Sequence, residues 1–391
     1  MKNLFSALVV AISVLLMMTS TAFGYDGTLA GFKTHVAKYA PHAPIPEVLT
    51  TTELNDATIR YGIWRTTKAR QGLVVFVSGR TEFIEKNLPA YTELLAKGFD
   101  VYTFDWRGQG LSERQLRHSE PGHIENFDTF VADLDAFVHQ IVRPEQQSGM
   151  ILLMGHSMGG NIGLRYLQKH HNVFDRAQFS SPMMGLSANN WLTRQFAGFL
   201  HWAGWGQSCA PGGQPVWKSY LDQNACDAII NDTISMPEKP ERALLYSHNL
   251  NYLAQASCWV EQSLAHNPKH HLGLGCPTVD WVRAAFATTE YVMNHLDQIK
   301  IPVVIVGSAA DKIVTFEAQQ QACSNMGNCC LWEVIGSEDK AAAHEIMIEI
   351  DNYTRQYWTA FDALTHSSDA GCACAELRDK FSHLQCSKET L

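Results

Sequence analysis

Ser157, Asp311 and His344 follow one another along the chain in the residue types and the order that nucleophilic acyl transfer requires. A serine hydroxyl is a weak nucleophile until a neighbouring base takes its proton, and a histidine base needs a carboxylate to orient it. Ser157 stands in the stretch G-H-S-M-G, residues 155–159. Chance alone places G-x-S-x-G in roughly one chain in ten of this length, so the motif needs support from its surroundings.

The sequence around Ser157 predicts a strand, a sharp turn and a helix. The apolar run MILLMGH ends directly before the serine, and SMGGNIGLRYL continues with helical spacing. A serine nucleophile needs this arrangement, with Gly155 and Gly159 relieving crowding and the helix N-terminus offering backbone amides. A glycine-rich turn without chemistry is the alternative.

Asp311 and His344 follow two later apolar runs. Asp311 comes just after residues 301–306, and His344 lies in the loop after residues 330–335. Sheets of parallel strands present functional loops at the carboxyl ends of their strands. We therefore expect His344 to be the base and Asp311 its orienting carboxylate, although a solvated aspartate and a solvated histidine are the simpler interpretations in a chain with 17 histidines.

Several ordered motifs between residues 73 and 350 resemble one family. GHSMGG, FDWRGQGLS (104–112), GSAADKIV, HEI and the segment GCPTVDWVRAAF (275–286) together are similar to the α/β-hydrolase fold, in its monoacylglycerol lipase and bacterial lysophospholipase branch. The resemblance implies the same roles for Ser157, Asp311 and His344. It also implies a single-chain lipid ester as substrate, such as a lysophospholipid or a monoacylglycerol, and no cofactor.

An oxyanion hole needs two backbone N–H donors, one after the serine and one from an early loop. Met158 supplies the first, and Arg80 stands where monoacylglycerol lipases have the residue after a His-Gly pair, with Ser78 in place of that histidine. The Arg80 and Glu82 side chains either bind a polar head group or pair with each other on the surface. Three further charged residues are expected to support loops or a helix start: Asp105, Arg107 and Glu345.

Apolar runs alternating with helical patterns predict the elements that position these residues. Two helices are expected, at 87–97 and 125–142. Such alternation predicts an α/β fold with a mostly parallel central sheet and helices on both faces. Six buried strands are expected, at 73–77, 99–104, 150–154, 177–180, 301–306 and 330–335.

The alternation stops after residue 182 and resumes at 301. We expect residues 25–182 and 301–365 to form the core domain and residues 183–300, with six tryptophans, to form an inserted helical cap. The expected acyl pocket lies at the base of this cap, although the same side chains could simply be cap core. The residues predicted to bind substrate are Met183, Met184, Leu186, Trp191 and Trp281.

The N-terminus predicts export. Lys2 precedes an apolar run and small residues at Ala22 and Gly24, so residues 1–24 are interpreted as a cleaved signal peptide, with an uncleaved anchor as the alternative. The predicted location is secreted or periplasmic. A net charge of -9 without a basic block disfavours nucleic-acid binding. Transient contact of the cap with a membrane surface is expected.

All ten cysteines follow Ser157, which in an exported chain favours disulfides over metal. Cys323 is predicted to pair with Cys329 or Cys330. The four cap cysteines are expected to pair among themselves, in one of three ways. No pairing is predicted for the three in the tail, residues 366–391. Cys372 and Cys374 lack a second ligand pair at zinc-finger spacing, so no metal is expected.

Other activities on a similar scaffold are less consistent with the sequence. A proline-type serine aminopeptidase is expected to carry a His-Gly-Gly-Pro-Gly loop, whereas residues 78–82 are S-G-R-T-E. Dehalogenases and epoxide hydrolases need an aspartate at position 157. An inactive lipid-binding module remains the non-enzymatic alternative, although degenerate members usually lose a residue of the triad.

Overall fold

The protein's structure is a computed structural model that describes residues 24–146, 148–186, 191–238, 240–336, 342–366 and 384–386. Its described strands form one twisted sheet of nine, in the order β1-β2-β4-β3-β5-β6-β7-β8-β9. The bounds are β1 (Val48–Leu54), β2 (Ala57–Trp64), β3 (Gly72–Val77), β4 (Phe99–Phe104), β5 (Met150–His156), β6 (Arg176–Ser180), β7 (Val303–Gly307), β8 (Cys329–Glu333) and β9 (Leu384–Cys386).

Strands β3 to β8 are mutually parallel and form the centre of the sheet. They match the six predicted strands within three residues at each end. Strands β3 and β4 are buried at every position, as expected when helices cover both faces of a sheet. The apolar runs therefore located the buried strands correctly.

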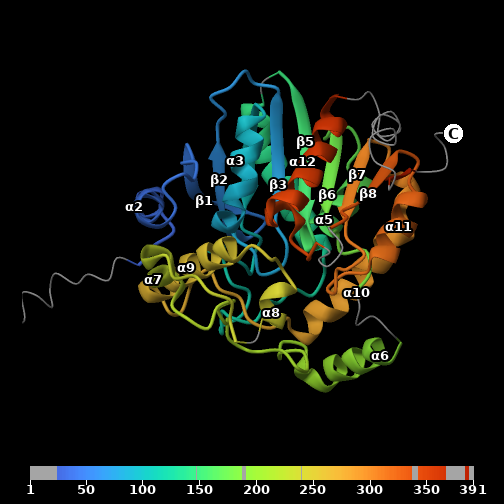
Figure 1. Cartoon of the computed structure of the whole chain (residues 1–391). Coiled ribbons are helices and arrows are strands. Elements are labelled where there is room, and N and C mark those ends of the chain that lie inside the picture. The colour runs from blue at the N-terminus through green and yellow to red at the C-terminus, as the bar shows by residue number, and fades with distance from the viewer. Residues whose placement is uncertain are drawn as a thin grey trace, which may run out of the picture.

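Helices cover both faces of this sheet (Figure 1). Helices α3 (Leu88–Ala96) and α12 (Asp351–His366) pack with one apolar cluster, whose sheet residues include Val74 and Val306. Helices α4 (Asp128–Phe137), α5 (Met158–Lys169) and α11 (Phe316–Ser324) pack with a second cluster that contains Val75 and Ile305. Alternate residues of a strand point to opposite faces, so each strand contributes to both clusters. The predicted α/β architecture is confirmed.

The edges of the sheet were not predicted. Strands β1 and β2 form an antiparallel hairpin, and β2 pairs antiparallel with β4. At the far edge β9 pairs antiparallel with β8. The helix expected at 125–142 begins at Asp128, and its last turn, Val138–Val142, is a π-helix.

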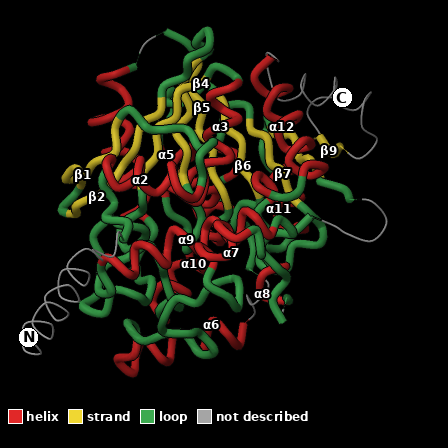
Figure 2. Tube along the Cα trace, turned by 60° about the vertical axis from the view of Figure 1, so that its left-hand side comes forward, coloured by secondary structure: helices red, strands yellow, loops and turns green. Residues whose placement is uncertain are grey.

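The segment between β6 and β7 is mostly helical and lies beyond one end of the sheet strands (Figures 1 and 2). Its last α-helix, α10, packs against α5, and Thr288 of α10 bonds the side chains of Arg165 and Asn161 of α5. This part of the segment is thus joined to the core by buried polar contacts. The bounds are α6 (Trp191–Leu200), a π-helical turn (His201–Trp205), α7 (Ala225–Asn231), α8 (Glu241–Leu244), α9 (Leu250–His266) and α10 (Val279–Met293).

Three disulfides join described residues: Cys209–Cys276, Cys226–Cys258 and Cys323–Cys329. The pairing of the four cap cysteines among themselves is confirmed, and Cys323 pairs with Cys329, the first of its two predicted partners. The predicted signal peptide and tail lie outside the described residues, apart from Gly24, His366 and β9. Among the described helices, none is both long and apolar enough to cross a membrane.

Helix α2 (Leu29–Tyr39) joins the N-terminal segment to both parts of the molecule. Trp259 of α9 stacks on His35 and Phe32 of α2, and Phe32 also meets Trp64 of β2 edge to face. Burial in this aromatic stack lowers the pKa of His35 to about 3, so the imidazole is neutral at physiological pH. The core and the segment between β6 and β7 therefore share an apolar contact at this end.

Candidate active site

Ser157 occupies a strained turn between β5 and α5. Its φ and ψ are 51° and -114°, a conformation that side chains rarely adopt and that strand-to-helix turns impose on nucleophiles. The chain crosses close to a neighbouring loop here, because a Cβ on Gly159 would lie 2.4 Å from the carbonyl oxygen of Val77. Only glycine fits at 159, as the sequence predicted, and the amides of the first turn of α5 begin directly after the serine.

Asp311 and His344 form a hydrogen-bonded pair. The His344 Nδ1 lies 2.6 Å from Asp311 Oδ2, while Asp311 Oδ1 accepts from the amides of Ile313 (2.8 Å) and Val314 (3.1 Å). Burial alone would raise the pKa of Asp311, but the charge and hydrogen bond of His344 and the two amides outweigh it, so the pKa is lowered. Asp311 thus stays ionised and fixes His344 with Nε2 left for another partner.

Ser157 and His344 both line one cavity of about 200 Å³. Both residues are described, and no hydrogen bond joins Ser157 Oγ to His344 Nε2; such catalytic bonds often tighten only with substrate bound. The lining is largely apolar. It consists of Arg80, Thr81, His156, Ser157, Met158, Met183, Leu186, Tyr246, Trp281, Ile313, Val314, His344 and Glu345.

Three of the five predicted substrate-binding residues line this cavity: Met183, Leu186 and Trp281. The structure places the other two elsewhere. Met184 is buried in the core cluster, and Trp191 begins α6 with 70% of its surface exposed. The placement of Trp191 is a correction: α6 lies away from the ends of the sheet strands (Figure 1), and its aromatic side chains are exposed.

The loop that carries Arg80 is fixed by bonds to its neighbours. Trp106 Nε1 donates to Ser78 O (2.8 Å), the Thr81 amide donates to Gln109 Oε1 (2.8 Å), and the Gly79 amide donates to the Glu82 carboxylate (2.5 Å). Arg80 and Met158 both line the cavity that holds Ser157. Their backbone amides are the donors predicted for an oxyanion hole.

The side chain of Arg80 points into the segment between β6 and β7. Its Nη2 donates to Gly275 O (2.6 Å), and the guanidinium lies 5.3 Å from the ring centre of Trp281. Burial lowers the pKa of Arg80 to about 10. Pairing of Arg80 with Glu82 on the surface, one of the two expectations, is wrong because Glu82 is buried and bonds the Gly79 amide and His156, whereas Arg80 bonds Gly275 O.

Glu82 belongs to a buried set of charges that the sequence did not reveal. Its Oε1 lies 3.0 Å from His156 Nδ1 and 3.5 Å from Lys86 Nζ. Lys86 also pairs with Glu345, and His156 Nε2 donates to His344 O at 3.3 Å. These contacts connect the Arg80 loop, the turn at Ser157 and the loop of His344 in a closed ring.

The pKa shifts of His156 and Lys86 agree with the contacts that these buried charges make. Burial alone would lower the pKa of His156, but the adjacent Glu82 and Glu345 carboxylates outweigh it and raise the pKa. Both ring nitrogens of His156 face acceptors, as an imidazolium requires. Burial disfavours the Lys86 ammonium, yet Glu345 holds its pKa well above the ordinary value. Three tyrosine rings lie 5.7–6.0 Å from Lys86 Nζ: Tyr220, Tyr246 and Tyr252.

Other charged residues singled out in the sequence shape loops. Asp105 accepts from the amides of Ile84 and Leu111, both at 2.9 Å, and Arg107 donates from two nitrogens to Asp133. Both are buried. Glu345 stands at the start of a short 3-10 helix (Ile346–Ile348), as expected, but its carboxylate bonds Lys86 and caps no backbone amide.

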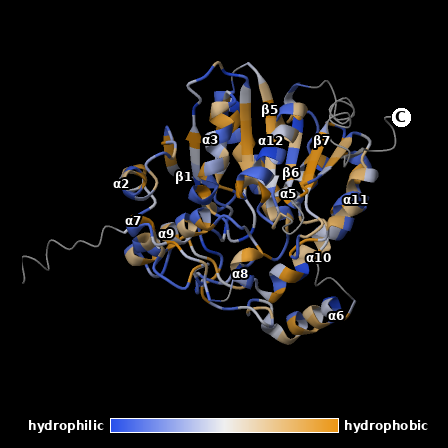
Figure 3. Ribbon diagram, viewed as in Figure 1, coloured by the Kyte–Doolittle hydropathy of each residue, from blue (hydrophilic) through white to orange (hydrophobic). Residues whose placement is uncertain are grey.

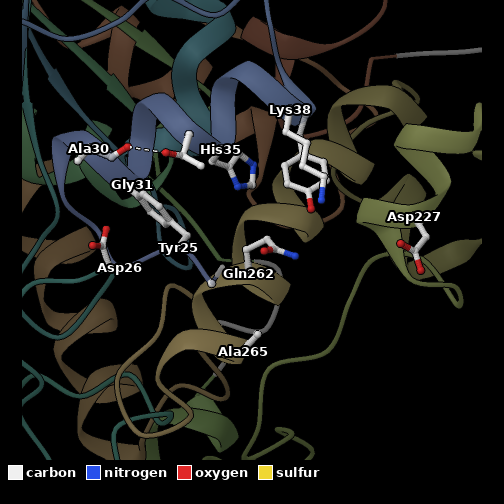
Figure 4. Close-up of a pocket in the computed structure, with 12 residues that line it drawn as sticks. Tyr25, Asp26, Ala30, Gly31, His35, Lys38, Asp227, Gln262 and Ala265 are labelled. Carbon is white, nitrogen blue, oxygen red and sulfur yellow. Dashed lines mark hydrogen bonds between the residues drawn. The ribbon is translucent and has the colours of Figure 1, made fainter. Parts of the chain in front are cut away.

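A larger cavity, of about 580 Å³, lies between α2 and the helices α7 and α9 (Figure 4). It is lined by polar and aromatic side chains that include Tyr25, His35, Lys38, Asp227 and Gln262. Ser157 and His344 lie in the smaller cavity. Cavity size alone would therefore not identify the candidate site, which is marked instead by the strained serine and the carboxylate-bound histidine.

Comparison with known proteins gives a family and a fold. Residues 68–351 match the model of a family described as serine aminopeptidase, S33. The chain is 28% identical to lysophospholipase L2 of Escherichia coli (strain K12), over 77% of this chain and 82% of that protein. It is 24% identical to probable lysophospholipase L2 of Haemophilus influenzae, over 72% and 80%. A soluble variant of monoglyceride lipase from Saccharomyces cerevisiae has a similar fold, with a TM-score of 0.56 and 18% identity over 84% of this chain and 97% of that one.

Proposed function

The chain belongs to the serine aminopeptidase S33 family, within the α/β-hydrolase fold, and on that premise we propose that it is an exported serine hydrolase of single-chain lipid esters. It is similar in sequence to lysophospholipase L2 and in fold to a monoglyceride lipase. The proposed substrates are lysophospholipids or monoacylglycerols. Cleavage is proposed to proceed through an acyl-enzyme intermediate.

The observation that carries this proposal is the strained Ser157 in one cavity with His344, whose Nδ1 is hydrogen-bonded to Asp311. In the proposed reaction His344 Nε2 takes the hydroxyl proton while Ser157 Oγ attacks the ester carbonyl. The oxyanion then accepts hydrogen bonds from the amides of Met158 and Arg80. His344 gives its proton to the leaving alcohol, and water activated by the same histidine releases the acid.

The cavity supports a single apolar chain as the acyl group. Its volume of about 200 Å³ lies below the usual range for whole ligands, about 300–1,000 Å³, so it fits an ester and part of one chain. Met183, Leu186 and Trp281 give that space apolar walls. A diacyl lipid would need room for a second chain beside the first.

Helix α6 supports the proposed contact with a lipid surface. The exposed apolar side chains of this region include Trp202, with 81% of its surface exposed, and the helix lies at the end of the molecule farthest from the sheet (Figure 3). Tryptophan favours the boundary between water and lipid. The full set is Trp191, Leu192, Phe196, Phe199, Trp202 and Trp205.

Export is proposed from the apolar run within residues 1–24 and is supported by the three disulfides, because disulfides persist in oxidising compartments. The test is cell fractionation combined with mass spectrometry of the N-terminus. Full-length protein recovered from the cytoplasm with free thiols at Cys226 and Cys258 would overturn this part of the proposal.

A fluorophosphonate probe tests the nucleophile. We expect a single adduct on the peptide that contains Ser157 and none in the Ser157→Ala variant, whose ester hydrolysis should fall roughly 10⁶-fold. The variant His344→Ala, which removes the proposed base, is compared with His139→Ala, which removes an exposed histidine. Ester hydrolysis retained by folded Ser157→Ala, or a parent protein without adduct, would instead favour a binding module.

A substrate screen tests the chemical class. It compares p-nitrophenyl esters of increasing acyl length, a lysophospholipid, a monoacylglycerol and an aminoacyl amide. The amide is included because the family's description names an aminopeptidase. We expect turnover of the lipid esters, and preferential cleavage of the amide would overturn the assignment. Trp202→Ser should lower hydrolysis of lysophospholipid in vesicles but not of a soluble ester, whereas Ile230→Ser, at an exposed apolar residue of α7, should change neither.

A further inference from the structure

Three side chains with metal-ligating atoms meet where the loop before α4 lies against the start of α10. They are His123 and Glu125, from the loop before α4, and Asp280, from the first turn of α10. One ligand atom from each lies within 4.8 Å of the others. His123 and Asp280 are buried, whereas Glu125 is exposed. The sequence predicted no metal site, because Asp280 lies 155 positions after Glu125 in the chain.

The backbone around this cluster is fixed by several cross-links. Gly122 donates to Cys276 O (2.8 Å), and Thr278 donates back to Gly122 O (2.9 Å). The Asp280 amide donates to Gly206 O (2.9 Å), and the Cys209–Cys276 disulfide joins the same two segments of the chain. A metal site gains affinity when its ligands stand on a frame that is already rigid.

Polar partners orient the two buried ligands. His123 Nδ1 lies 3.0 Å from Thr278 Oγ1, which leaves Nε2 on the side of Glu125, whose Oε1 is 4.0 Å away. Asp280 Oδ1 accepts from His201 Nδ1 (2.6 Å) and from Arg283 Nη1 (3.2 Å). Metal-bound imidazoles and carboxylates are held in this way by hydrogen bonds from their outer atoms.

We propose that His123, Glu125 and Asp280 form a binding site for one divalent transition-metal ion, with Zn²⁺ as the probe ion. One imidazole and two carboxylates suit Zn²⁺, with ligand distances of about 2.0–2.2 Å and a water in the fourth position. Glu125 is free to move inward because it is exposed. A cavity of about 600 Å³, lined in part by His123, Glu125 and Gln207, gives the ion a route from solvent.

Bound metal at this site would link the core loop before α4 to α10 and, through Asp280 and His201, to the end of α6. Because His201 directly follows α6, the ion would stabilise α6 and the π-helical turn after it, which together carry the exposed tryptophans. The simpler alternative is that Asp280 only pairs with His201 and Arg283. The two alternatives differ in whether the folded protein binds Zn²⁺ through His123 and Glu125.

The test is equilibrium dialysis of the tag-free, disulfide-intact protein against Zn²⁺, with Ca²⁺ in a parallel series. Glu125→Gln is the main variant because an exposed side chain can be changed without loss of folding. His123→Ala is the second, checked by circular dichroism. The matched control is His139→Ala, which removes an exposed imidazole that lies 3.4 Å from Asp135, a carboxylate that also contacts His170 at 3.1 Å.

We expect one Zn²⁺ per chain and weaker binding of Ca²⁺. The affinity for Zn²⁺ should fall at least about tenfold in Glu125→Gln and in His123→Ala but stay unchanged in His139→Ala. Saturating Zn²⁺ should also raise the Tm of the parent and not that of Glu125→Gln. The proposal is overturned if the parent binds no Zn²⁺ in stoichiometric amount, or if Glu125→Gln binds it as tightly as the parent. These readouts are independent of ester hydrolysis, so they stand whether or not the proposed function holds.

Discussion

Replacing Lys86 with methionine should destabilise the protein strongly, and in a way that depends on pH. Lys86 is buried, and its ammonium pairs with Glu345 and lies 3.5 Å from Glu82. Removing one partner of a buried ion pair leaves an uncompensated charge, which typically costs about 3–5 kcal/mol. Glu82 keeps His156 and the Gly79 amide, so Glu345 bears most of the loss.

The sign of the pH dependence follows from the pKa of Glu82. Burial alone would raise the pKa of this carboxyl, but His156 and Lys86 outweigh burial and lower it. A group with a lowered folded pKa contributes stability that is present above its unfolded pKa, about 4.3, and is lost as pH falls through the folded pKa. Lys86→Met removes part of this contribution, so its deficit should be largest near pH 8 and shrink towards pH 3, by up to about 1.4 kcal/mol per pH unit.

Urea unfolding followed by tryptophan fluorescence, without reductant, measures this effect at both pH values. Lys97→Met is the control, because Lys97 pairs with Asp362 at a part-exposed site, where such pairs contribute about 0–1 kcal/mol. The double variant Lys86→Met/Glu345→Gln removes both charges and should recover at least about 2 kcal/mol of the loss. The argument fails if Lys86→Met costs no more than Lys97→Met at pH 8, if its deficit does not change with pH, or if the double variant recovers nothing.

Three further predictions concern the turn, the triad and the cap. Asp311→Asn should keep the fold but lower kcat on a soluble ester about 10⁴-fold, because the amide stabilises the wrong tautomer of the histidine; a loss below tenfold would contradict the pairing. Gly159→Ala places a Cβ 2.4 Å from Val77 O and should lower the free energy of unfolding in urea by about 1–3 kcal/mol, and an unchanged midpoint would count against the close approach. Cys226→Ser/Cys258→Ser opens a loop spanning 32 residues and should cost about 3.7 kcal/mol by loop entropy, visible as a lower Tm; an equal Tm would show that the bridge does not constrain the unfolded chain.

The sequence predicted the centre of the sheet because buried parallel strands are continuous apolar runs. Strand β3 is G-L-V-V-F-V and is buried throughout. Strand β1, V-L-T-T-T-E-L, is buried only at Leu49 and Leu54 and contains three threonines, so it lacks such a run. One signal was present: Asn55 and Asp56 join β1 to β2 with φ values of 45° and 68°, and an Asn-Asp pair suits the two positive φ values of a tight hairpin.

The triad was predictable because its residues occupy fixed places relative to strands. Ser157 follows β5 at once, and Asp311 follows β7 after a short turn, so strand prediction places both at the same end of the sheet. The charges that support them carry no such signal. Lys86 and Glu345 are separated by 259 positions, and each looks like a residue of a solvated helix or loop until the fold brings them together. The same holds for His123 and Asp280.

Trp191 shows why the substrate residues were harder to predict than the triad. A tryptophan in an inserted segment can line a pocket, fill a core or face solvent, and the sequence patterns of the three overlap. Trp281 lines the cavity because it stands on α10, which packs back onto α5 of the core. Trp191 stands on α6, which has few contacts with the core and leaves its aromatic side chains exposed. Which helix of the insertion a residue belongs to decides its role, and that depends on tertiary packing.

Arg80 links the reaction centre to the insertion. Its backbone amide is the proposed second oxyanion donor, while its guanidinium bonds Gly275 O and lies over Trp281, two residues of the insertion. Displacement of that segment would break both contacts of the guanidinium. The opposite side of the same loop is fixed to the core by Glu82, through the Gly79 amide and His156. The position of the proposed oxyanion donor is therefore set jointly by the core and by the inserted segment, so residues of the insertion that never touch the ester carbonyl can still influence the rate of its attack.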